Sequence, residues 1–203
     1  MVLNLDFENS DTTNIFDTSR YHNNGVITGT TRQEKGYRFN GTSDKVVVTT
    51  AAQLQIVVSR ITIMAWVKTA TTAEQAIIDK ENDGDTPTAG YALRVSTTGN
   101  AEFTTNNDKY SSGVSVVDNV PHFICGVLDG TNKFIVVDDK LAVTKAYTTA
   151  ITDSALNLGV GSQQKATNEI YYNGIIYFGK VYNKALTLTQ IIDIYNSTKY
   201  RYK

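Results

Sequence analysis

Short apolar stretches alternate with turn residues along the whole sequence, and this spacing limits the fold more than any other feature. The stretches are roughly four to eight residues long, and Asn, Gly or Asp interrupts them about every 8 to 12 residues. This spacing is typical of antiparallel strands joined by tight turns. Val, Ile, Thr and the 12 tyrosines also suit pleated, half-buried surfaces. The sequence therefore predicts an all-β fold, either a sandwich or a barrel.

The strand expected over residues 61–68 is apolar on both of its faces. Ile63 and Val67 lie on one face, and Met64 and Trp66 lie on the other. Because successive side chains of a strand point to opposite sides, both sides of this strand have to be covered. We predict a central strand in which Trp66 is a core residue; the alternative is an exposed platform for a sugar ring.

Other segments show the same alternation or short apolar runs. Further strands are expected over residues 2–7, 37–39, 45–48, 76–78, 91–96, 101–105, 123–128, 133–137 and 156–159. The turn at residues 40–43 is expected to join two of these strands as a hairpin. Residues 187–190 form a capping box that predicts about two turns of helix through Tyr195. The tail, residues 198–203, has no pattern that would bury it, so we expect it to fray.

Size and charge exclude several classes of protein. The 203 residues suit one domain, spanning 1–203, and 19 basic against 20 acidic residues give a net charge of −1. This balance argues against binding to nucleic acid, and the apolar runs are too short for membrane insertion. The single cysteine, Cys125, lies in an apolar segment, where we expect a core thiol. Residues 1–8 lack the features of a signal peptide, which indicates a protein made without one or a module of a longer exported protein.

Four segments follow one another in a fixed order: residues 3–8 (LNLDFE), 37–44 (YRFNGTSD), 61–68 (ITIMAWVK) and 181–186 (VYNKAL). Together they resemble the laminin-G-like jelly roll of the concanavalin A-like lectin/glucanase superfamily. The stretches 17–25, 76–80, 91–95 and 123–130 fit the same order, so the resemblance covers nearly the whole chain. It implies a two-sheet antiparallel jelly-roll sandwich with one short C-terminal helix, used for binding glycans or proteins and often accompanied by calcium. Tyr177 and Phe178 depart from the family, because carboxylates are usual at these positions.

An acidic loop is the first candidate site. Residues 79–85 (DKENDGD) contain four carboxylates, and calcium accepts such hard oxygen ligands in irregular geometry. We predict calcium ligands at Asp79, Glu81, Asp83 and Asp85; a solvated acidic turn is the alternative. A second candidate metal site is the loop that contains Asp17, Asn23 and Asn24. The alternative is an Asx turn, which would explain these residues without an ion.

Two turn-like segments pair tyrosine with amide or carboxylate groups, as sugar-binding sites do. The predicted ligand-binding residues are Asn106, Asn107, Asp108, Tyr110, Tyr171, Tyr172 and Asn173. Ordinary strand ends of a β-sheet protein are the alternative interpretation of both segments.

Catalytic motifs are missing from the sequence. The best candidate for the carboxylate pair of a glycoside hydrolase is the segment 81–85 (ENDGD), but this segment reads as a turn that would not hold such a pair rigidly. We therefore expect a non-enzymatic binding or adhesion module that recognises a glycan or glycoprotein on an extracellular, cell or virion surface. The alternative is a structural subunit of a virion or extracellular appendage that assembles with other subunits. A glycoside hydrolase or lyase is the third hypothesis.

Overall fold

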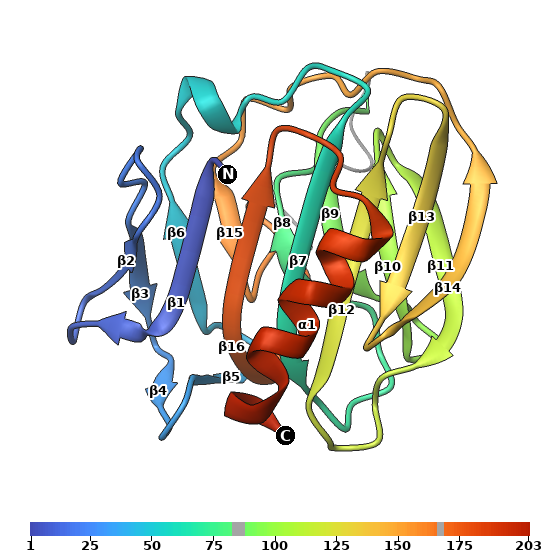
Figure 1. Cartoon of the computed structure of the whole chain (residues 1–203). Coiled ribbons are helices and arrows are strands. Elements are labelled where there is room, and N and C mark those ends of the chain that lie inside the picture. Colours follow the sequence, from blue (N-terminus) through green and yellow to red (C-terminus); the bar gives the residue numbers. More distant parts are fainter. Residues whose placement is uncertain (83–87, 166–168) are drawn as a thin grey trace.

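The computed structural model describes residues 1–82, 88–165 and 169–203, which form sixteen strands, one short 3₁₀ turn and one α-helix (Figure 1). The strands are β1 (Leu3–Ser10), β2 (Asn14–Asp17), β3 (Gly25–Thr28), β4 (Thr31–Arg32), β5 (Tyr37–Asn40), β6 (Lys45–Val48), β7 (Ile61–Lys68), β8 (Gln75–Asp79), β9 (Tyr91–Val95), β10 (Asn100–Thr105), β11 (Asp108–Ser115), β12 (His122–Leu128), β13 (Asn132–Val137), β14 (Lys140–Ala146), β15 (Leu158–Val160) and β16 (Asn173–Tyr182). The 3₁₀ turn is Ala52–Leu54, and the helix α1 is Leu188–Tyr202.

The strands hydrogen-bond into one sheet that curls until it is nearly closed. Its order is β11-β10-β9-β8-β15-β6-β3-β2-β1-β16-β7-β12-β13-β14, with β5 paired to β16 and β4 paired to β5. The edge strands β11 and β14 contact each other, and β10 packs against β12 and β13 across the core. The all-β prediction is confirmed and the arrangement is jelly-roll-like. The expected division into two separate sheets is not seen in the strand pairing, because hydrogen bonds link the strands of the described residues along the whole path.

The strand β7 is central, as its sequence predicts. It lies between β16 and β12, and all of its residues except Lys68 are buried. The face with Ile63 and Val67 joins the main core inside the curled sheet, while Met64 and Trp66 join a second apolar cluster outside it. The core assignment of Trp66 is confirmed.

The turn after β5 does not make the expected hairpin. Its sequence does fold tightly, because the Asn40 Oδ1 atom accepts hydrogen bonds from the backbone N–H groups of Thr42, Ser43 and Asp44. The two flanking strands nevertheless have different partners: β5 pairs with β4 and β16, whereas β6 pairs with β3 and β15. The chain therefore crosses between distant parts of the sheet at this point.

The helix α1 begins as predicted and ends later than predicted. The hydroxyl of Thr187 accepts from the backbone N–H of Gln190, and the Gln190 side chain accepts from the backbone N–H of Thr187. The expectation of a frayed tail at residues 198–203 is wrong, because the helix continues to Tyr202, which is only 5% exposed. Its ring packs on those of Trp66 and Tyr177, so the apolar stripe of the helix extends through the tail.

The helix covers the outer apolar cluster. It lies across the outside of β16, β7 and β12, as Figure 1 shows, and contacts Phe123 and Phe178 as well as Trp66. Within the described ranges, no helix has the length and apolar character needed to cross a membrane.

Candidate functional site

The predicted calcium ligands Asp79 and Glu81 are buried and face an arginine. The Nε atom of Arg94 lies 2.7 Å from Asp79 Oδ2, and its Nη2 atom lies 3.4 Å from Glu81 Oε2. All three side chains are fully buried, so the guanidinium supplies positive charge where a cation was expected. Asp83 and Asp85 lie outside the described residues, and no cluster of His, Cys, Asp or Glu suited to a metal occurs within them. Calcium at this loop stays a prediction that rests on Asp83 and Asp85.

The second acidic loop is organised by hydrogen bonds. The Asp17 carboxylate accepts from the backbone N–H groups of Asn4, Ser19 and Asn23, each at 2.8 Å, and from the Ser19 hydroxyl at 2.7 Å. The backbone N–H of Asp17 donates to the side chain of Asn24 at 2.9 Å. Because donors occupy both carboxylate oxygens, these bonds account for the loop as an Asx-type turn without an ion.

The segment Asn106–Asn107 forms the tight turn between β10 and β11. Both residues have positive φ angles, 50° and 61°, which suit a two-residue hairpin turn. The side chain of Asn106 bonds the backbone of Ala150 and Thr152, and the backbone N–H of Asn107 donates to Glu81. These two residues hold neighbouring loops together.

Asp108 and Tyr110, on β11, contact two lysines. The ammonium groups of Lys133 and Lys145 lie 3.1 and 2.5 Å from the Asp108 carboxylate, and Lys145 also lies over the Tyr110 ring. Burial lowers the pKa of Lys133 to about 8. The carboxylate of Asp108 therefore forms ion pairs with lysines of the fold.

The segment at residues 171–173 is divided between the core and the surface. Tyr172 is fully buried and packs edge-on against Phe39, so it does not face solvent. The hydroxyl of Tyr171 donates to the Glu169 carboxylate, which raises the pKa of Tyr171 to about 12. Asn173 opens β16 and is partly exposed, and its side-chain amide makes no hydrogen bond to any described residue.

Asn173 lies between two neighbouring cavities of about 460 and about 300 Å³, which share Thr71 and Asn173 and which we call the rim basin. The larger cavity is lined by Arg38, Lys68, Thr69, Ala70, Thr71, Asn119, Asn173, Gly174 and Ile175. The smaller is lined by Gly41, Thr71, Ala73, Glu74, Gln75, Glu169, Ile170, Tyr171 and Asn173. The basin thus contains cationic, acidic, amide and hydroxyl groups, together with one of the predicted tyrosines.

Two residues of the rim basin, Tyr171 and Asn173, are predicted from the sequence as ligand-binding residues. Arg38, Lys68 and Asn119 also line the basin and are not predicted. These three residues belong to separate segments with no shared motif. The pairing of β5 and β7 with β16 brings Arg38 and Lys68 together, and a backbone hydrogen bond from Asn119 to Thr69 adds the third residue. These contacts are not visible in the sequence.

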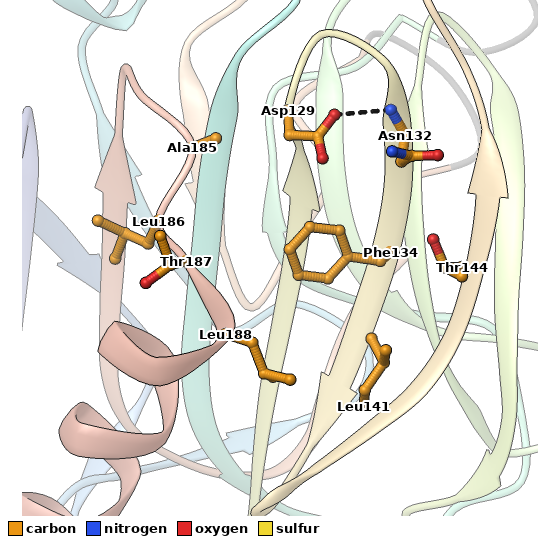
Figure 2. A pocket seen from close by; sticks show the side chains of 9 residues that line it. All are labelled: Asp129, Asn132, Phe134, Leu141, Thr144, Ala185, Leu186, Thr187 and Leu188. Carbon is orange, nitrogen blue, oxygen red and sulfur yellow. Dashed lines mark hydrogen bonds between the residues drawn. The ribbon is translucent and has the colours of Figure 1, made fainter.

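A second depression, of about 360 Å³, lies between the start of α1 and the strands β13 and β14. Figure 2 shows the ring of Phe134 at its centre, with Leu141 and Leu188 below it and Asp129 at its upper end. One oxygen of Asp129 accepts bonds from Thr131 and from the backbone of Asn132, so this carboxylate is part of its own turn. The depression of Figure 2 is mainly apolar, unlike the rim basin.

The curled antiparallel sheet and the helix that covers it define an all-β, jelly-roll-like domain. The family model of the concanavalin A-like lectin/glucanases superfamily matches residues 39–192. The chain belongs to this superfamily, and the resemblance noted in the sequence is confirmed.

Solved structures share the fold at low sequence identity. The binding domain of botulinum neurotoxin DC, in complex with rat synaptotagmin II, is 19% identical with a TM-score of 0.69, covering 98% of this chain and 52% of that one. The sialidase of Trypanosoma rangeli, in complex with sialic acid, is 14% identical with a TM-score of 0.71, covering 97% and 33%. The binding domain of Paraclostridial Mosquitocidal Protein 1 is 14% identical with a TM-score of 0.71, and the match covers 97% of this chain and 52% of that one. The chain thus spans about half the length of the toxin domains. No protein with a curated description matches it.

Proposed function

We propose that this protein is a carbohydrate-binding module and that the rim basin is its binding site. One observation carries the proposal: polar side chains without internal partners gather around Asn173. Among the described residues, the side chains of Arg38, Lys68, Thr71 and Asn119 also make no hydrogen bond or ion pair. Amide, hydroxyl and charged groups arranged around a concave surface suit the hydroxyl groups of a saccharide.

The fold neighbours support this proposal at a coarse level. One of them is the botulinum neurotoxin DC binding domain solved in complex with SialylT, at 16% identity. Likeness at this level concerns the fold, so the sugar recognised here has to come from the chemistry of its own residues.

We propose a binding role without catalysis. The carboxylates Asp79 and Glu81 face Arg94 within the fold, which argues against their use as a general acid and nucleophile. The proposal includes a location outside the cell or on a cell or virion surface, with a glycan or glycoprotein as partner. Calcium at residues 79–85 is a separate proposal, supported by the clustering of carboxylates in the sequence.

A glycan array tests the binding proposal with two matched variants. Asn173→Ala removes an amide from the rim basin, and Asn132→Ala removes one from the depression of Figure 2. We expect the wild-type protein to bind one class of saccharide, Asn173→Ala to weaken that binding about tenfold, and Asn132→Ala to leave it unchanged. Loss with Asn132→Ala alone would move the site to the depression of Figure 2. A silent array together with large assemblies in light scattering would favour the structural-subunit hypothesis instead.

A further inference from the structure

Two cations stand on either side of one residue of β16. Ile175 pairs with Arg38 of β5 on one side and with Lys68 of β7 on the other. Directly opposed residues of antiparallel strands project their side chains to the same face, so Arg38, Ile175 and Lys68 form a row across the sheet. Two strand spacings separate the Cα atoms of Arg38 and Lys68 by about 10 Å. Their long side chains both line the larger cavity of the rim basin.

The positive charge of this row is not neutralised by any described residue. Neither Arg38 nor Lys68 forms an ion pair within the described ranges. The two carboxylates of the basin, by contrast, already have cationic partners. Glu169 lies 3.5 Å from Lys45, and Glu74 lies 2.5 Å from Lys109. The basin therefore has one end with compensated charge and one end with two uncompensated cations.

The backbone around the cations is held in place by buried side chains. The Thr69 hydroxyl donates to the carbonyl of Asn173 at 2.6 Å, and the Gln75 side chain accepts from the Asn173 N–H at 2.8 Å. Gly174 also lets β16 approach β7 closely, because a Cβ atom at this position would lie 2.1 Å from the carbonyl oxygen of Lys68. The strands β16 and β7, which carry Ile175 and Lys68, are thus fixed against each other before any ligand arrives.

We propose that the rim basin binds an anionic saccharide, with a carboxylate or sulfate group of the ligand lying between Arg38 and Lys68. This inference rests on the proposed function and adds the charge class of the ligand to it. The guanidinium of Arg38 presents paired donors that match the geometry of a carboxylate or sulfate, while Lys68 supplies a compact charge. The amides of Asn119 and Asn173 lie beside the cations and bind the neighbouring hydroxyl groups of the sugar.

The test compares three oligosaccharides that share one neutral core: the core alone, the core with a carboxylate-bearing sugar, and the core with a sulfate ester. Binding is measured by titration calorimetry for the wild-type protein and for Arg38→Gln and Lys68→Gln. Lys140→Gln is the control, because it removes the same charge from the exposed edge strand β14. We expect at least one anionic form to bind ten times or more tightly than the core. Each basin variant should lose about tenfold of that affinity, and the control should lose none.

The outcomes separate this inference from the proposed function. Preference for the carboxylate or for the sulfate form identifies the source of the negative charge. Binding of all three forms with equal affinity, sensitive to Asn173→Ala but not to Arg38→Gln or Lys68→Gln, would overturn the inference and leave the carbohydrate-binding proposal standing. If no saccharide binds while thermal melts show every variant folded, both the proposed function and the inference are overturned. Affinity for an anionic form should also fall as salt rises, because exposed charges are screened.

Discussion

At the scale of single residues, Trp66 joins the sheet to the helix. Its indole Nε1–H donates to the Thr198 hydroxyl at 2.9 Å, and its ring stacks on Tyr195 with the ring centres 5.6 Å apart. The only tryptophan in the chain is therefore fully buried between the outer face of β7 and the helix α1. An aromatic ring in this environment contributes to stability and is not accessible to a sugar.

Substitution of Trp66 should affect folding before it affects binding. We expect Trp66→Ala to reduce the free energy of unfolding by ~3 to 5 kcal/mol, because it removes a large buried side chain and leaves a cavity. Trp66→Phe should lose less, about 1 kcal/mol, since only part of the packing and one hydrogen bond disappear. Urea denaturation followed by circular dichroism measures both. A near-wild-type Trp66→Ala protein that has lost only saccharide binding would contradict the core assignment.

His122 is a pH-dependent contact between two loops. The Asp138 carboxylate accepts a hydrogen bond from its ring and, with help from Asp118, raises the pKa of His122 above its usual 6.5. The folded state thus binds this proton more tightly than the unfolded state, so the contribution to stability is full below about pH 6.5 and disappears as pH rises through the folded-state pKa. Wild-type protein should exceed His122→Gln by on the order of 1 kcal/mol at pH 5.5 and by less at pH 8.5. Equal differences at the two pH values would show that the charge on His122 does not contribute.

At the scale of elements, the last turn of α1 closes the outer apolar cluster. Tyr202 lies over Trp66, Tyr177 and Phe178, and Arg201 reaches Asp6 of β1 at 3.1 Å. The C-terminal end of the helix is therefore attached to the sheet. Isolated helices of this size are marginal in water, so packing on the sheet is the main source of the stability of α1.

Two tyrosines of α1 provide a matched comparison. Tyr202 is 5% exposed, whereas Tyr200 is 82% exposed on the same turn. We expect Tyr202→Ala to lower the free energy of unfolding by on the order of 3 kcal/mol and to shift the emission of Trp66 to longer wavelength as water reaches the indole. Tyr200→Ala should change neither. Similar effects of the two substitutions would show that Tyr202 is not packed on the sheet and that the tail is frayed.

The strands that sequence analysis finds and those it misses differ in burial. Residues 61–68 are predicted with the observed bounds of β7, because both faces of this strand are apolar. The edge strands β11 and β14 are missed, since their side chains are mostly exposed. The short strands β2, β3 and β4 are missed as well. The helix start is predicted from its capping box, a local signal, whereas its end depends on contacts with distant strands. Local patterns predict elements, and tertiary contacts determine where they end.

At the scale of the whole molecule, calcium would act as a ligand that binds only the folded state. If the acidic loop binds it, the stability gained equals RT ln(1 + [Ca²⁺]/Kd), about 2.7 kcal/mol at a hundredfold excess over Kd. We expect excess chelator to lower the melting temperature and Asp83→Ala to abolish this difference. Asp17→Asn serves as the comparison variant for the other acidic loop. If the melting curves with calcium and with chelator superimpose, the protein has no calcium site that stabilises its folded state.

The candidate site is less accessible to sequence analysis than the fold. The family is visible in four segments, of which residues 61–68 and 181–186 lie wholly within the range 39–192 that the family model matches. Of the seven predicted ligand-binding residues, Tyr171 and Asn173 line the rim basin, while Asn106 and Asp108 contact other parts of the fold. A turn that binds a sugar and a turn that ties two loops use the same residue types, so composition alone does not separate them.

The pairing of β1 with β16 also determines when this protein can finish folding during its synthesis. Leu3 lies opposite Val181, and β16 bonds to β5 and β7 as well. A ribosome makes β1 many seconds before β16, since elongation proceeds at about 5 to 20 residues per second. Until then, one side of β1 remains an open strand edge able to pair with other chains. A product truncated before residue 173 would lack β16 and would expose that edge permanently.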